Sequence, residues 1–132
     1  MERREGIDRP NEEAFAAFSE RAAEGPVYML NLLEFQPEGG AERYGEYGEA
    51  VAPLFAKAGG KPIFAGRPSE QLIGEGSWDL MLVVSYPTRQ AFLDMVSSPD
   101  YQAIEHLRSE ALLRSELRAM DAIDTSGLAE AG

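Results

Sequence analysis

Residues 78–108 read WDLMLVVSYPTRQAFLDMVSSPDYQAIEHLR, and this stretch decides the fold that the sequence predicts. Residues 78–86 alternate between two largely apolar faces, which is typical of a central strand that is covered on both sides. A helix follows, and then Ser98 and Pro99 have the pattern of an N-cap and a first helical position. This second helix is predicted to run to about Leu113. The stretch therefore predicts a strand followed by a helix that is broken in two.

The rest of the chain adds three strands and two helices around this stretch. The predicted segments are a helix at 10–24, a buried strand at 27–35, a helix at 41–58, a strand at 61–66 that resumes at 70–74, and an edge strand at 115–121. Without the first helix the order is β-α-β-β-α-β. This order is typical of the split βαβ (ferredoxin-like) arrangement, an α+β fold with a four-stranded antiparallel sheet.

A sheet of this kind has one face that its own helices do not cover. The strands at 27–35 and 78–86 are nevertheless apolar on both faces, so the second face must be buried by something else. An identical sheet from a second copy of the chain is the simplest candidate. We therefore expect a homodimer that buries sheet against sheet.

Length and composition limit the possible classes of protein. The 132 residues suit a single domain, predicted at 10–123, with a flexible arm at 1–9 and a flexible tail at 124–132. The absence of cysteine excludes disulfides and thiol chemistry, and the single histidine leaves no credible metal site, so we expect no metal and no cofactor. A net charge of −11 would repel a nucleic acid. No apolar run approaches the roughly 18 residues of a membrane span, and we expect a cytoplasmic protein.

Four segments resemble the domain-of-unknown-function 1330 (DUF1330) family. They are YMLNLLEF, EYGEAVAPLFAKAGGKPIFAGRP, WDLMLVVSYPTRQAFLDM and SPDYQAIEHLR, and the resemblance spans roughly residues 27 to 121. It implies membership of the dimeric α/β-barrel superfamily, which includes cofactor-independent monooxygenases, isomerases and haem-degrading enzymes. The resemblance thus implies a ferredoxin-like dimer, whereas the chemistry differs among proteins that share this scaffold.

Arg108 is the first candidate site residue. On a helical wheel it falls within the apolar arc of Tyr101, Ile104 and Leu107, where a guanidinium needs compensation for its desolvation. Two explanations remain open. Arg108 could form a structural salt bridge, for example to Glu34 or Asp79, or it could bind an anionic ligand.

His106 is the second candidate, because it is the only histidine and the resembling family tends to carry a His-x-Arg pair like His106 and Arg108. The wheel places it about 160° from Arg108. We therefore expect it to face solvent, the N-terminal helix or a partner subunit, with contact to a ligand as the alternative.

Asn31 interrupts an otherwise apolar strand, so its amide must find partners. It either fixes a helix or loop, or faces the cleft between sheet and helices as a hydrogen-bond donor to a ligand. Tyr44 and Tyr47 are either core aromatics or phenols that line space left by Gly45 and Gly48.

Two further residues complete the candidates. Trp78 is expected to pack at one end of the barrel, and Arg67 is expected in a loop that reaches the mouth of the cleft.

Two functions remain. The first is binding or transformation of a small carboxylate, enolate or aromatic molecule held by Arg108 and Asn31, with monooxygenase, isomerase or dehydratase chemistry and no assigned catalytic residue. The second is a non-catalytic homodimeric assembly or regulatory module.

Overall fold

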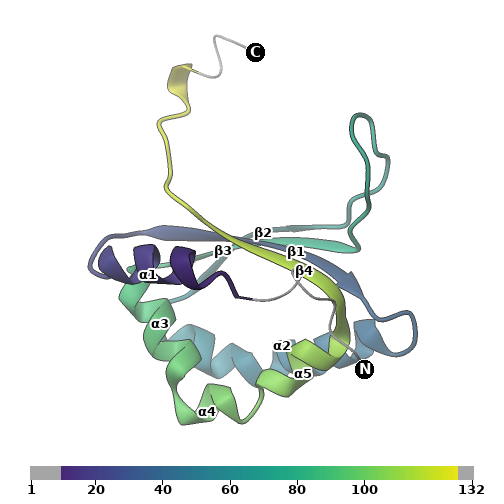
Figure 1. Ribbon diagram of the computed structural model, residues 1–132, viewed down its shortest axis with the longest axis horizontal. Coiled ribbons are helices and arrows are strands. Elements are labelled where there is room, and N and C mark those ends of the chain that lie inside the picture. The colour runs from purple at the N-terminus through teal and green to yellow at the C-terminus, as the bar shows by residue number, and fades with distance from the viewer. Residues whose placement is uncertain (1–9, 128–132) are drawn as a thin grey trace.

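The computed structural model describes residues 10–127, which form a single sheet with helices on one side (Figure 1). In chain order the elements are α1 (Glu12–Glu20), β1 (Val27–Phe35), α2 (Gly40–Lys57), β2 (Lys61–Gly66), β3 (Leu80–Tyr86), α3 (Arg89–Ser97), α4 (Pro99–Gln102), α5 (Glu105–Ala111) and β4 (Leu112–Met120). The strands are antiparallel in the order β2-β3-β1-β4. The predicted split βαβ fold is confirmed. The predicted arm at 1–9 and the end of the tail at 128–132 lie outside the described residues.

Side-chain caps fix where three of the helices begin. The side chains of Asn11, Thr88 and Ser98 accept hydrogen bonds from backbone N–H groups in the first turns of α1, α3 and α4, at 2.9, 3.1 and 3.2 Å. Helix α2 ends before Gly59, which has a φ of 80° that glycine adopts without strain. The caps at Thr88 and Ser98 and the stop at Gly59 lie where the sequence predicted them.

Several predicted boundaries are wrong. The central strand, predicted at 78–86, is β3 and begins at Leu80, and residues 78 and 79 belong to the loop before it. The second part of the broken helix consists of α4 and α5, and it ends at Ala111, so β4 begins at Leu112 and not at 115. The predicted strand at 70–74 is a loop, since residues 67–79 join β2 to β3 without strand pairing. The first helix covers Glu12–Glu20, within the predicted 10–24.

The core lies between the sheet and the helices in two clusters. The larger contains Val27 and Met29 of β1 with Phe92 and Met95 of α3, and the smaller is centred on Leu33. Alternate residues of β1 therefore face the helices, and the residues between them face the opposite side of the sheet.

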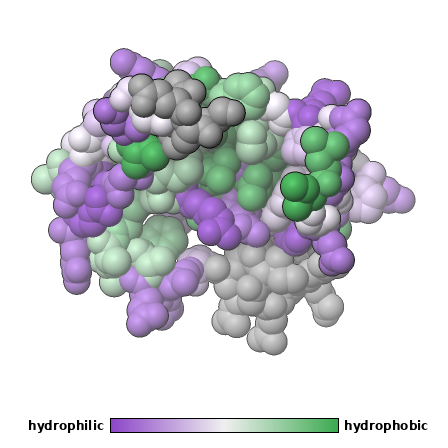
Figure 2. Space-filling view, turned by 90° about the horizontal axis from the view of Figure 1, so that it is seen from above, coloured by the Kyte–Doolittle hydropathy of each residue, from purple (hydrophilic) through white to green (hydrophobic). Residues whose placement is uncertain are grey.

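That opposite side, here called the bare face, has no helix over it (Figure 1). The register of the strands brings together on it, as half-exposed apolar side chains, Tyr28, Leu30, Leu32, Met81 and Val83. Figure 2 looks onto this face and shows apolar side chains gathered along its middle, with hydrophilic groups around them. An apolar area of this kind is typical of a surface that another protein covers.

Among the described residues, no helix has both the length and the apolar content needed to cross a bilayer. The cytoplasmic location stays a prediction.

Candidate functional site

Three tyrosines, Tyr44, Tyr47 and Tyr101, form a cluster beneath the sheet, between α2 and α4. The ring centroids of Tyr44 and Tyr47 are 5.4 Å apart, and those of Tyr47 and Tyr101 are 6.3 Å apart. The hydroxyls of Tyr47 and Tyr101 share a buried hydrogen bond of 3.0 Å. Burial raises the pKa of the Tyr44 and Tyr47 phenols, so both are neutral at physiological pH and remain able to donate a hydrogen bond.

Replacing Tyr47 with phenylalanine should destabilise the fold by about 1 kcal/mol, because the buried hydroxyl of Tyr101 would lose its partner. Urea unfolding measures this effect. In a double-mutant cycle, adding Tyr101→Phe to Tyr47→Phe should cost less than Tyr101→Phe alone costs in the wild type. Additive losses would show that the two hydroxyls do not stabilise each other.

Arg108 of α5 is half-buried next to this cluster. Its guanidinium lies beside the Tyr44 phenol, and its charge lowers the pKa of both Tyr44 and Tyr47 against the larger effect of burial. No carboxylate within the described range 10–127 lies within salt-bridge distance of Arg108. Next to the cluster there is therefore a cation whose charge no carboxylate of the described residues balances.

The two carboxylates considered as salt-bridge partners of Arg108 are engaged elsewhere, and neither pairs with it. The carboxylate of Glu34 pairs with Arg114 at 3.1 Å on the bare face. The carboxylate of Asp79 accepts the backbone N–H of Phe35 at 2.8 Å. Glu34 thus joins β1 to β4, and Asp79 joins the loop before β3 to β1, at one end of the sheet. Position along the chain alone could not reveal these contacts, because they connect distant segments.

Asn31 lies on the side of β1 that faces the helices, between Met29 and Leu33. Its side chain is half-exposed, and among residues 10–127 no hydrogen bond to its amide is found. Leu117, its neighbour on β4, is 42% exposed. The helices thus leave part of the sheet open beside Asn31, and the amide does not fix a helix or loop of the described chain.

The space expected beside Gly45 and Gly48 does not adjoin the phenols. Both glycines are exposed, and a Cβ placed on either would meet no atom within 4 Å. The tyrosines lie on the opposite, inward side of α2. The open space at these glycines is therefore solvent.

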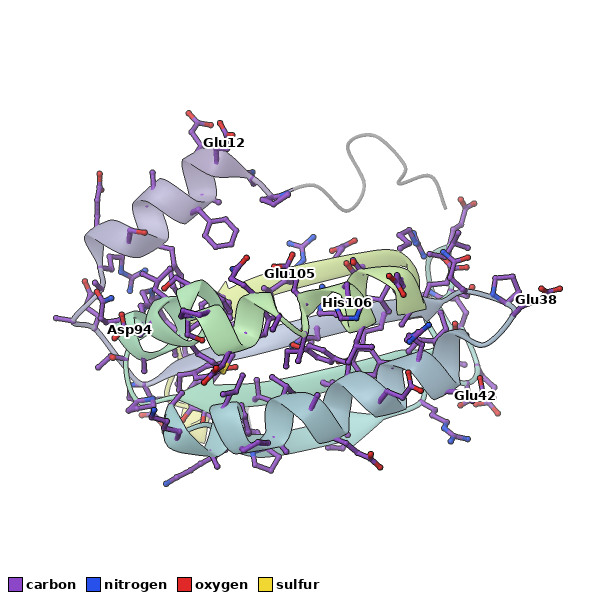
Figure 3. The ribbon with its side chains drawn as sticks, turned by 90° about the horizontal axis from the view of Figure 1, so that it is seen from below. Glu12, Glu38, Glu42, Asp94, Glu105 and His106 are labelled. Atoms are coloured by element: carbon purple, nitrogen blue, oxygen red, sulfur yellow. The ribbon has the colours of Figure 1, made fainter. Side chains whose placement is uncertain are left out.

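His106 is exposed on α5, as its position on the wheel predicted. Figure 3 views the molecule from the helical side and shows His106 and Glu105 at the surface of this helix. His106 is therefore not brought together with the tyrosine cluster.

Trp78 and Arg67 also lie apart from the cluster. The Arg114 guanidinium stacks 3.8 Å from the centroid of the Trp78 ring and donates to the backbone carbonyl of Ser77, so Trp78 is fixed at the end of the sheet. Arg67 is exposed at the start of the loop between β2 and β3, which projects away from the helices (Figure 1). Among the described residues, no hydrogen bond or ion pair joins Arg67 to the tyrosine cluster.

Sequence reasoning missed a second buried arginine, Arg89. Its side chain is 3% exposed, it pairs with Asp121 at 3.1 Å, and its guanidinium lies 5.3 Å from the centroid of the Phe18 ring. Arg21 and Arg89 together hold the pKa of Asp121 below its usual range. The helical spacing of Arg89, Phe92 and Val96 was the available signal, because it places Arg89 on the buried side of α3.

These contacts give Arg89 a structural role. They connect the start of α3, the end of β4 and the N-terminal helix.

In the described part of the chain, no three His, Cys, Asp or Glu side chains are grouped so that they could hold a metal ion.

The sheet order and the helices on one face define a ferredoxin-like α+β protein. The chain belongs to the family described as Domain of unknown function (DUF1330), whose model matches residues 26–121. The predicted resemblance is confirmed. Helix α1 precedes the matched region.

Solved structures agree with the ferredoxin-like fold. A protein of unknown function from Rhodopseudomonas palustris is 33% identical with a TM-score of 0.84, over 90% of this chain and 98% of that chain. A dimeric ferredoxin-like protein of unknown function from a Jannaschia species is 13% identical with a TM-score of 0.59, over 74% and 100% of the two chains. A dimeric protein of unknown function from Bacteroides fragilis, also with a ferredoxin-like fold, is 14% identical with a TM-score of 0.55, over 76% and 99%. No curated protein matches the chain.

Proposed function

We propose that the protein is a homodimer that binds a small organic anion on the helical side of its sheet, with Arg108 as the cationic anchor. The observation that carries this proposal is the half-buried guanidinium of Arg108, for which the described residues provide no carboxylate. A partly desolvated guanidinium is stabilised by an anion, and its planar fork of donors matches a carboxylate in a bidentate geometry.

The surroundings of Arg108 indicate the kind of anion. The Tyr44 phenol is neutral and next to the guanidinium, and Asn31, on the side of the sheet that faces the helices, offers an amide with no partner in the described chain. The exposed Leu117 adds an aliphatic side chain on this side of the sheet, and the buried Tyr47 packs against Tyr44. A carboxylate or enolate on a small aromatic or apolar body would satisfy both the polar and the apolar groups.

An anchored anion would also permit chemistry. A guanidinium and neutral hydrogen-bond donors stabilise negative charge as it develops on an enolate oxygen. Cofactor-independent oxygenation, isomerisation and dehydration all pass through such a charge, and they are the reaction classes we propose if the bound molecule is transformed.

The bare face supports the homodimer and also favours the second candidate function, a non-catalytic assembly or regulatory module. Its half-exposed apolar row, Leu30, Leu32, Met81 and Val83, needs a cover, and a second copy offers an identical apolar row. The module and the anion binder share this dimer, and they differ only in whether Arg108 binds a ligand.

A thermal-shift screen of the purified protein against small aromatic acids, lactones and quinones tests the binding function. Benzoate, salicylate and related carboxylates should raise the melting temperature by about 5 °C or more when present at about 100 times their Kd. Neutral analogues such as benzamide serve as controls and should have a much smaller effect. Flat melting curves across all three classes of compound would contradict anion binding and leave the assembly module.

A further inference from the structure

The loop between β2 and β3, residues 67–79, carries the two most exposed large apolar side chains of the described residues. Leu72 is 89% exposed and Ile73 is 91% exposed. Figure 1 shows this loop projecting from the sheet on the side away from the helices, so it stands at one end of the bare face. Two adjacent aliphatic side chains that are exposed to solvent at the end of an apolar face indicate a contact with another molecule.

A depression of ≈ 260 Å³ lies at the opposite end of the same two strands. It is mostly apolar, and its lining residues are Pro26, Tyr28, Gly59, Lys61, Ile63, Ser85, Tyr86 and Pro87. These residues belong to the start of β1, the start of β2 and the end of β3, whereas the loop follows the end of β2. A dry cavity of roughly 150 Å³ can hold a benzene ring, so the depression has room for two aliphatic side chains.

We propose that Leu72 and Ile73 of one subunit dock into this depression on a second copy of the chain. Two identical sheets can stack face to face about a two-fold axis that lies between them and is perpendicular to the strands. Rotation about this axis reverses the strand direction, so each end of β2 and β3 lies over the opposite end of the same strands in the partner. The loop then meets the partner's depression, and the symmetry produces this contact twice. The proposal deepens the homodimer of the proposed function and rests on it.

The length of the loop fits this contact. Packed sheets lie about 10 Å apart, and an arm of six extended residues spans about 20 Å. The loop is thus long enough to pass the end of the partner's sheet, where the connections at Pro26, Gly59 and Pro87 border the depression.

The charges are also complementary. Glu70 and Glu75 flank the aliphatic pair, while the depression contains Lys61, one of only two lysines in the chain. Within residues 10–127, Lys61 forms no salt bridge. A second copy therefore supplies both the apolar groups and the carboxylates that this end of the bare face accommodates.

The first test compares dimer affinities by sedimentation equilibrium. The double variant Leu72→Ser/Ile73→Ser should raise the dimer Kd by about 100-fold or more, and it should remain folded because both side chains are exposed. Phe15→Ser is the control, since Phe15 is 39% exposed on α1, on the helical side of the sheet, and its Kd should equal that of the wild type. An unchanged Kd in the double variant would overturn the proposal.

The second test uses the absence of cysteine from the chain. Two single variants, Ile73→Cys and Ile63→Cys, are mixed and oxidised under mild conditions. The mixture should form a disulfide-linked dimer, while each variant alone should not, because the two-fold axis keeps identical positions apart. A wild type that is monomeric would overturn both this proposal and the homodimer. A dimeric wild type without the mixed cross-link would overturn only the docking of the loop.

Discussion

Val83→Glu should convert the dimer into a folded monomer. Val83 lies near the centre of the bare face, with Leu30 of β1 on one side and Phe64 of β2 on the other. In the single chain this position is half-exposed, so the carboxylate can reach water and the fold should persist. Between two stacked sheets it would be desolvated, at a cost of several kcal/mol for each of two symmetry-related charges. We expect the dimer Kd to rise more than about 1,000-fold.

Sedimentation velocity at micromolar concentration measures this change, and circular dichroism checks the fold. Ala119→Glu is the matched control, because it places the same charge at an exposed position on the helix-facing side of β4. The control should stay dimeric. A dimeric Val83→Glu variant would show that the bare face is not the interface.

The sequence predicted the elements that depend on local patterns. The strands Val27–Phe35 and Lys61–Gly66 have the predicted bounds, since a short apolar run between turn residues is a local signal. Helix α2 agrees within one residue at each end, where Gly59 ends an apolar stripe with helical spacing.

The features that depend on distant residues could not be predicted in this way. Strand β4 begins at Leu112 because this residue pairs with Phe35 across a register shift, which no local pattern shows. The loop at 70–74 contains the apolar pair Leu72 and Ile73, so its composition resembles that of a strand even though it has no strand to pair with.

The candidate site shows the same difference between local patterns, which were predicted, and contacts between distant residues, which were not. The helical wheel correctly separated Arg108 from His106, because the direction of a side chain on a helix follows from spacing alone. It could not find the partner of Arg108. Its neighbour is the Tyr44 phenol of α2. The carboxylates of Glu34 and Asp79, which were expected there, contact residues of other segments.

Arg108→Ala should remove most of the affinity for an aromatic carboxylate while leaving the dimer intact. Hydrogen bonds that involve a charged group contribute about 1.5–3 kcal/mol, which corresponds to a loss of roughly 10-fold to 100-fold in affinity. Arg108→Lys should lose part of this affinity, because a lysine keeps the charge and lacks the planar fork. Arg118→Ala is the matched control, because Arg118 lies beside Leu30 on the bare face, on the side of β4 away from the helices, where it is 66% exposed and paired with Glu116.

Isothermal titration of wild type, Arg108→Ala and Arg118→Ala with the aromatic carboxylate that most raises the melting temperature tests the central claim most directly. We predict that wild type and Arg118→Ala bind with equal affinity, and that Arg108→Ala binds at least about 10-fold more weakly as a folded dimer. Equal affinities in all three proteins would contradict the role of Arg108 as the anion anchor. A dimer that dissociates or unfolds in Arg108→Ala would instead assign Arg108 a structural role.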